Sequence, residues 1–271
     1  MGRDLLNTGR EHAWSWPLED WDQMWRPRMW LKKPPRPHKT HFWHIAAIIV
    51  IATYANIISN LILDEVWHIP FQLGILGVAV LIATRAGTTR TSMGLRRDRA
   101  RRGFIVGGVI IGLITVGFLI VIAAAAVFPD LRTMFDNTEV IEGTTGWVLF
   151  QAFVRIPIAT ALYEEVLFRG VIFGMFARRH SPLLAAVLTS LLFGLWHIAP
   201  TIVDPPNAQL DPNGLLDIVK LAALAVAGTA PAGLAFLWTR LYANSVWASV
   251  LAHIGTNSIG MLAALFVVKV M

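Results

Sequence analysis

The sequence predicts an all-α fold, a polytopic transmembrane helix bundle of about seven spans with an N-terminal interfacial helix. Of the 271 residues, 55% are hydrophobic and only 15% are charged, whereas soluble domains carry roughly 25% charged residues. The net charge of +6 is therefore interpreted as membrane topology and contact with lipid, not as binding of nucleic acid. The chain has no cysteine, which excludes disulfides, thiolate catalysis and cysteine-based zinc sites.

Residues 1–40 are predicted to form a tryptophan-rich, basic tail that contacts the membrane surface. Large apolar side chains recur at helical spacing along one face: Trp14, Leu18, Trp21, Trp25 and Met29. Tryptophan is favoured at the membrane interface, so we expect an amphipathic helix lying in that plane. A disordered tail with incidental tryptophans is the alternative. Residues 32–39 hold three prolines and four Lys or Arg, and we interpret them as an irregular linker.

Seven apolar stretches are each long enough to span a bilayer, which needs about 20 residues. They cover residues 42–63, 68–86, 104–128, 147–177, 182–200, 215–239 and 245–268. The first three form an N-terminal part, residues 41–128, and the last four form a second part, residues 145–268.

Two of these spans have features of their own. In the fourth, we expect the segment around Arg155 to lie at the interface and the helix to enter the membrane at Pro157. In the sixth, small residues follow one another at spacings of three and four and are expected to let a neighbouring helix approach closely: Ala225, Gly228, Ala232 and Ala235.

The distribution of basic residues predicts the orientation of the chain. Residues 1–40 hold eight Lys or Arg and residues 85–103 hold seven, and Arg178, Arg179 and Arg240 lie in later loops on the same side. The alternate loops are mainly acidic. Because basic loops stay in the cytoplasm, we predict a multi-pass protein of a cell membrane with a cytoplasmic N-terminus and an external C-terminus.

Charged residues inside the fourth span mark a candidate site. Glu164, Glu165 and Arg169 lie within an apolar run, and ionisable groups at membrane depth indicate function by default. Glu165 and Arg169 are four residues apart, so they can pair on one face of a helix. Glu164 is left without a local partner. A salt bridge that only fixes packing is the alternative.

Two histidines lie well within later apolar stretches. Phe193 and His197 are spaced to share one face of the fifth span, and His253 and Asn257 share one face of the seventh. At 1.5 Å per residue, His197 lies roughly 24 Å from Ser181, and Glu164 lies roughly 21 Å from Arg178. We therefore expect these groups to meet in the middle or outer part of the bilayer.

The ordered set Glu-Glu-x-x-x-Arg, Phe-x-x-x-His and His-x-x-x-Asn resembles the CPBP family, which includes type II CAAX prenyl endopeptidases and bacteriocin-processing or self-immunity proteins. The resemblance covers about residues 145–265. It implies that Glu164 and His197 activate water and that His253 and Asn257 stabilise the oxyanion. Glu165 and Arg169, with Phe193, would support the site. Peptide hydrolysis requires these two functions, a base for water and donors for the tetrahedral oxyanion.

The predicted function is therefore that of an intramembrane endopeptidase acting on a membrane-associated peptide or protein. Glu164, His197 and His253 are also ligands that zinc accepts. We favour catalysis without a metal or other cofactor, because the sequence has no His-Glu-x-x-His pair. The alternative function is a non-enzymatic immunity or adaptor protein that keeps the fold and binds a peptide or partner. A transporter is less consistent, since no internal repeat is found.

Overall fold

The computed structural model describes residues 41–203 and 214–271, and these residues are mostly helical. Among these described residues, seven helices are long and apolar enough to cross a membrane: Phe42–Leu61, Glu65–Arg85, Arg97–Val127, Thr145–Ala177, Pro182–Val203, Leu215–Ala243 and Val246–Val270. They match the seven predicted spans in order, so the predicted all-α polytopic bundle is confirmed. The predicted interfacial helix falls in residues 1–40, outside the described residues.

The helical segments follow the chain in three groups. The N-terminal group comprises α3 (Phe42–Leu61), the 3-10 turn η1 (Glu65–Trp67), α4 (His68–Arg85) and α5 (Arg97–Val127). The connection and the fourth membrane helix comprise η2 (Pro129–Phe135), α6 (Thr138–Glu142), α7 (Thr145–Phe150), η3 (Gln151–Leu162), α8 (Tyr163–Glu165), η4 (Val166–Ile172) and α9 (Phe173–Ala177). The last group comprises α10 (Pro182–Trp196), α11 (Ile198–Val203), α12 (Leu215–Ala243), α13 (Val246–Ile254), η5 (Gly255–Ile259) and α14 (Gly260–Val270).

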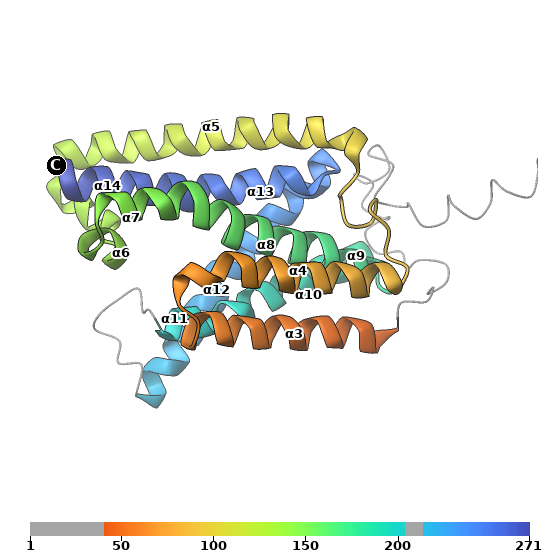
Figure 1. The fold of residues 1–271 in the computed structure, drawn as a ribbon. Coiled ribbons are helices and arrows are strands. Elements are labelled where there is room, and N and C mark those ends of the chain that lie inside the picture. Colours follow the sequence, from red (N-terminus) through yellow and green to blue (C-terminus); the bar gives the residue numbers. More distant parts are fainter. Residues whose placement is uncertain (1–40, 204–213) are drawn as a thin grey trace, which may run out of the picture.

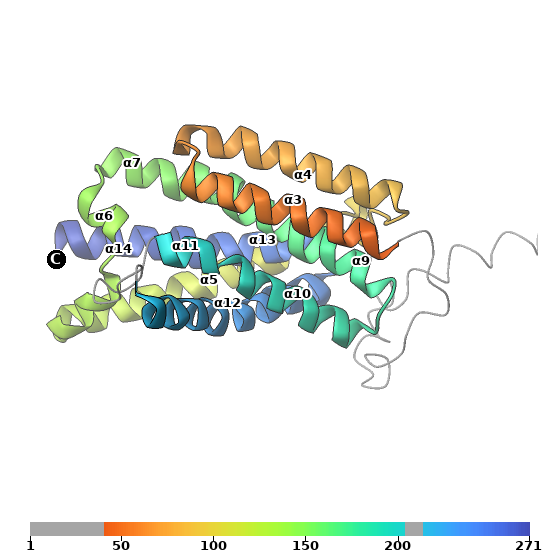
Figure 2. The same ribbon diagram turned by 90° about the horizontal axis from the view of Figure 1, so that it is seen from below.

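The long helices run side by side, and their turns gather at two ends of the bundle (Figures 1 and 2). One end carries the turns at residues 85–97, 178–181 and 243–246, and we call it the arginine end. The other carries residues 62–67 and 128–144 with the C-terminus, and we call it the C-terminal end. The fourth membrane helix, from α7 to α9, runs between α4 and the pair formed by α5 and α13 (Figure 1).

The fourth membrane helix is continuous from Thr145 to Ala177 and passes through Pro157 without a break in the helix. Pro157 lies within η3, a π-helical stretch, and a second π-helical stretch, η4, follows α8. Proline lacks the N–H that an α-helix needs and its ring clashes with the carbonyl four residues earlier. A π-helical stretch changes the hydrogen-bond partners along the backbone, and such stretches are frequent at functional sites. Glu164 and Glu165 lie between the two stretches, in α8.

Helix α5 packs on α13 through glycine. A Cβ added at Gly107 would lie 2.6 Å from the Cβ of Leu251, whereas one added at Gly108 would meet nothing within 4 Å. After Arg102, the large side chains of α5 that are exposed in the monomer are apolar, among them Val109, Leu113, Val116, Leu119 and Ile120. This apolar face suits contact with lipid.

The small residues predicted to allow a close approach of α12 are only partly the ones that do so. Gly228 has open space where a Cβ would be added, and Ala235 is exposed. Gly233 makes the close approach instead, since its added Cβ would lie 3.2 Å from the ring of Phe193 and 3.3 Å from an Arg169 nitrogen. The buried face of α12 also carries larger residues, so spacing among small residues did not identify it.

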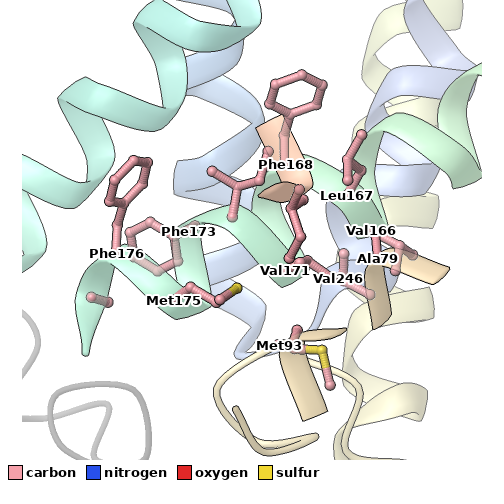
Figure 3. Close-up of a cluster of buried hydrophobic side chains, with 14 of the residues drawn as sticks. Ala79, Met93, Val166, Leu167, Phe168, Val171, Phe173, Met175, Phe176 and Val246 are labelled. Carbon is pink, nitrogen blue, oxygen red and sulfur yellow. The ribbon is translucent and has the colours of Figure 1, made fainter. Parts of the chain in front are cut away.

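An apolar cluster closes the arginine end of the fourth membrane helix (Figure 3). We call it the apolar plug and define it by five buried residues: Met93, Val171, Phe173, Met175 and Phe176. The loop between α4 and α5 lies directly on η4 and α9, because Cβ atoms added at Gly170 and Gly174 would lie 3.2 and 3.0 Å from its backbone oxygens. Arg240 holds this loop by donating to the Ser92 carbonyl at 2.6 Å.

Candidate active site

The two adjacent glutamates of α8 face different partners. Both are buried, Glu165 completely and Glu164 with 8% of its surface exposed. Glu165 faces Arg169 and His253, while Glu164 faces His197. Neighbouring residues on a helix point in directions about 100° apart, which explains why one carboxylate can contact Arg169 and His253 while the other faces His197.

Glu165 and Arg169 form the predicted ion pair inside the core. An Arg169 guanidinium nitrogen lies 2.9 Å from Glu165 Oε1, and both side chains are at most 1% exposed. The contact lacks the angles of a hydrogen bond, so we attribute it to charge attraction. Arg169 also lies over the ring of Phe193, 3.9 Å from its centroid, a distance at which a cation is attracted to an aromatic face.

Phe193 connects the two histidines. Its ring is 4.5 Å from that of His197 and 6.3 Å from that of His253, edge to face in both pairs. The structure therefore gives this residue three neighbours in the candidate site: two imidazoles and the guanidinium of Arg169. Phe193 lies close to both pairs of polar residues.

Glu164 and His197 leave a gap between two acceptor atoms. His197 Nδ1 lies 2.8 Å from the Phe193 carbonyl, and a carbonyl only accepts, so this nitrogen carries the proton. In the neutral ring Nε2 then presents its lone pair, 3.9 Å from Glu164 Oε2. That distance is too long for a direct hydrogen bond, but one water molecule can donate to both groups. The structure thus brings these two predicted residues together.

His253 and Asn257 also meet, one turn apart. The Asn257 side-chain nitrogen lies 3.2 Å from His253 Nε2, and His253 Nδ1 lies 2.9 Å from Glu165 Oε1. If Glu165 is ionised, Nδ1 donates to it, and the neutral ring then accepts a hydrogen bond through Nε2. His253 can therefore donate to an oxyanion only when Nε2 also carries a proton. The expectation from the sequence, that His253 and Asn257 both donate to the oxyanion, therefore requires His253 to be protonated at both ring nitrogens.

The hydrogen bonds of Thr256 show how that condition can be met. Its hydroxyl lies 2.9 Å from the His253 carbonyl and 3.1 Å from Asn257 Oδ1, yet it has only one proton to donate. The amide oxygen and nitrogen of asparagine are assigned from hydrogen bonding. With the Asn257 amide turned over, its nitrogen donates to Thr256 and its oxygen accepts from a protonated His253 Nε2.

Two hollows reach these residues from the C-terminal end. The first, about 450 Å³, is lined by Asn257, Thr256, Arg155 and residues of η2 and α6. The second, about 410 Å³, is lined by His197, Asn60 and residues of α11 and α12. Glu139 of α6 lines both. Asn257 and Thr256 are exposed, so this part of the site is open to a peptide.

Sequence reasoning missed several groups around the site. Phe236 stacks on His253 with 4.8 Å between ring centroids. Arg155 donates to Gln151 at 3.1 Å and lies 3.0 Å from His68 Nδ1, which fixes its head at the first hollow. Arg155 was noticed in the sequence only as an interfacial residue. Phe236 had no signal of its own, because aromatic residues are common in membrane helices.

As far as the structure describes the chain, the candidate site does not gather the three protein ligands typical of a zinc site. Within residues 41–203 and 214–271, no group of three His, Cys, Asp or Glu is placed to hold a metal ion. Both ring nitrogens of His253 are engaged, by Glu165 and Asn257. Glu164 and the Nε2 of His197 make a set of two, whereas zinc sites use three or four protein ligands.

Comparison with known proteins covers the part of the chain that holds the site. Residues 146–259 match the family model described as type II CAAX prenyl endopeptidase Rce1-like. No curated protein and no solved structure matches the chain. The matched segment includes all seven candidate residues, from Glu164 to Asn257. Residues 146–259 of this multi-pass membrane protein are therefore similar to the Rce1-like family, as the ordered sequence motifs indicated.

Proposed function

We propose that this protein is an intramembrane endopeptidase that cleaves a membrane-associated peptide or protein. The observation that carries the proposal is the pair of acceptors formed by Glu164 and His197, 3.9 Å apart. A water molecule that donates to both groups keeps an oxygen lone pair for attack on a carbonyl. The match to an endopeptidase family supports the same chemistry.

The proposed reaction is a hydrolysis in two steps. The water oxygen bonds to the peptide carbonyl carbon, and its proton passes to Glu164 or to Nε2 of His197. The carbonyl oxygen becomes an oxyanion, which accepts hydrogen bonds from the Asn257 side-chain nitrogen and from protonated His253, whose Nε2–H then donates to the oxyanion in place of Asn257 Oδ1. The C–N bond then breaks, and the proton that was taken from water goes to the leaving amine.

The supporting residues act on the geometry of these groups. Glu165 accepts from His253 Nδ1 and so fixes the orientation of that ring. Arg169 compensates the charge of Glu165 within the core. Phe193 provides the carbonyl that orients His197 and the ring that lies over Arg169. In this proposal none of the three needs to touch the substrate.

The test is to compare membranes treated with the parent protein and with two variants, Glu164→Gln and His197→Ala. Peptide termini in the membranes are then identified by mass spectrometry. We expect new termini with the parent and their loss in both variants, because each variant removes one of the two acceptors. The control is Glu142→Gln, which changes an exposed glutamate of α6 outside the two hollows.

Two results would contradict this assignment. If Glu164→Gln retains normal cleavage, water is not activated by this carboxylate. If the folded parent yields no new termini in any membrane, the chain is instead a binding protein that keeps the fold, such as an immunity or adaptor protein.

A further inference from the structure

We infer that the candidate site takes its substrate from the extracytoplasmic side of the membrane, so that the peptides it cleaves are exposed outside the cytoplasm. This inference rests on the proposed function in one respect, namely that the peptide bound at the site is a substrate that is cleaved. The direction from which the site is reached rests only on the shape and charge of the bundle.

The first observation is where the hollows open. Both are lined by Glu139 of α6, in the connection at the C-terminal end. The hollow at Asn257 is also lined by Met134 and Asp136 from the same connection. The hollow at His197 is lined by Thr201 and Val203 of α11. These segments lie at the end of the bundle that carries the C-terminus (Figures 1 and 2).

The second observation is that packing closes the arginine end of the fourth membrane helix. From Tyr163 to Arg178, every residue of the fourth membrane helix is buried. The apolar plug packs around the end of this helix that follows η4, at the arginine end (Figure 3). The loop that carries Met93 is tied down twice, by Arg240 on the Ser92 carbonyl and by the Val246 amide on the Gly94 carbonyl at 3.0 Å. A peptide would have to displace this packing to reach Glu164 from the arginine end.

The third observation is the distribution of charge between the two ends. The arginine end carries or adjoins Arg85, Arg90, Arg96, Arg97, Arg99, Arg101, Arg102, Arg178, Arg179 and Arg240. The connections at the C-terminal end carry mainly acidic residues: Asp64, Glu65, Asp130, Asp136, Glu139 and Glu142, with Arg132 as the basic one. Loops rich in Lys and Arg remain in the cytoplasm. The closed end therefore faces the cytoplasm and the open end faces outward.

The three observations together restrict the class of substrate. A cytoplasmic protein anchored to the inner leaflet approaches the closed, basic end, where the plug separates it from Glu164. A peptide segment that is exported, or that projects from the outer leaflet, approaches the end where Asn257 and His197 are reached through the two hollows. The CAAX-type substrate in the family description therefore does not follow for this chain.

The absence of cysteine from the chain allows a direct test. Single cysteines are introduced by three substitutions: Thr89→Cys at the arginine end, Thr138→Cys at the C-terminal end, and Thr256→Cys inside the hollow beside Asn257. All three threonines are exposed. A membrane-impermeant maleimide is added to right-side-out membrane vesicles, to inverted vesicles and to vesicles opened with detergent.

We expect the maleimide to label Thr138→Cys and Thr256→Cys in right-side-out vesicles and Thr89→Cys in inverted vesicles. The inference is overturned if Thr256→Cys is labelled from the same side as Thr89→Cys, or if it reacts in neither kind of sealed vesicle. It is also overturned if Thr89→Cys is the residue labelled in right-side-out vesicles. Met134→Cys, another exposed position in the same hollow, replaces Thr256→Cys if that variant does not fold.

The substrate class has its own readout. Among termini that depend on Glu164, we expect the cleaved bonds to lie in segments outside the cytoplasm. Cleaved bonds in cytoplasmic segments would overturn the inference while leaving the endopeptidase intact. Conversely, if no termini depend on Glu164, the proposed function fails, but the labelling still decides from which side the hollow is reached.

Discussion

Glu165 and His253 are 88 residues apart in the sequence and lie on different helices, yet Glu165 Oε1 lies 2.9 Å from His253 Nδ1. Glu165 is fully buried and His253 is 4% exposed. The same carboxylate oxygen also contacts Arg169. The buried carboxylate of Glu165 thus links two membrane helices, orients the imidazole of His253 and compensates the charge of Arg169.

The first prediction concerns stability and follows from this shared anion. Glu165→Gln leaves Arg169 uncompensated, and Arg169→Leu leaves Glu165 with His253 alone. Breaking one side of a buried ion pair costs about 3–5 kcal/mol. We therefore expect both single variants to unfold at lower temperature than the parent in detergent, measured by thermal melts.

The double variant Glu165→Gln/Arg169→Leu serves as the control for this pair. Because it removes both charges, it should be less destabilised than the sum of the single variants. If both single variants melt like the parent, or if their effects simply add in the double variant, the ion pair does not contribute to stability.

The second prediction concerns Phe193. Phe193→Leu removes the ring that lies 3.9 Å from the Arg169 guanidinium and touches both histidines. Loss of a desolvated cation–π contact costs about 2 kcal/mol, and misalignment of the site should lower the turnover number by about tenfold or more. Turnover is measured with the first substrate peptide identified from the membrane digests.

Phe176→Leu is the matched control for Phe193→Leu. Phe176 is also buried, at 7% exposure, but it belongs to the apolar plug. We expect it to lower the melting temperature with little effect on the turnover of the folded protein. Equal losses of turnover in the two variants would mean that Phe193 acts only through general packing.

The third prediction compares two neighbouring glycines of α5. Gly107→Ala places a methyl group 2.6 Å from Leu251, against α13, and overpacking of this kind costs about 1–3 kcal/mol. Gly108→Ala meets nothing within 4 Å, and alanine favours the helix over glycine by about 1 kcal/mol. Thermal melts should therefore show Gly107→Ala destabilised and Gly108→Ala equal to the parent or slightly more stable. The reverse order would exclude the α5–α13 contact.

The fourth prediction is that turnover needs no bound metal. Glu164 and His197 can activate water by hydrogen bonding alone, and His253 is engaged on both ring nitrogens. We expect purified protein to keep its activity after exhaustive chelation, with metal content measured by mass spectrometry. Stoichiometric zinc, with activity lost on chelation and restored by added zinc, would reverse this assignment and make His253 a candidate ligand in place of an oxyanion donor.

The sequence alone determined the number and order of the membrane helices and the residues of the candidate site. Helix length, apolar composition and the sign of the charge in each loop are properties of short stretches of sequence. The seven spans could therefore be predicted without knowing which helices they pack against. Contacts between residues four apart on one helix are equally local. Glu165 with Arg169, Phe193 with His197, and His253 with Asn257 all meet within single turns, as their spacing predicts.

Only the tertiary structure decided which residues of different helices meet. Whether His197 faces Glu164 or Glu165 depends on how each helix is rotated about its axis, and no local pattern fixes that rotation. The same holds for α12. Small residues including Gly228 were expected to make its close helix contact, but Gly233 makes it instead, against Phe193. The apolar plug and the two hollows likewise arise from segments far apart in the chain. In the plug, Met93 from the loop before α5 joins residues of α9, and in the first hollow Glu139 of α6 joins Asn257. Such contacts depend on how whole helices pack, which the spacing of residues within one helix does not specify.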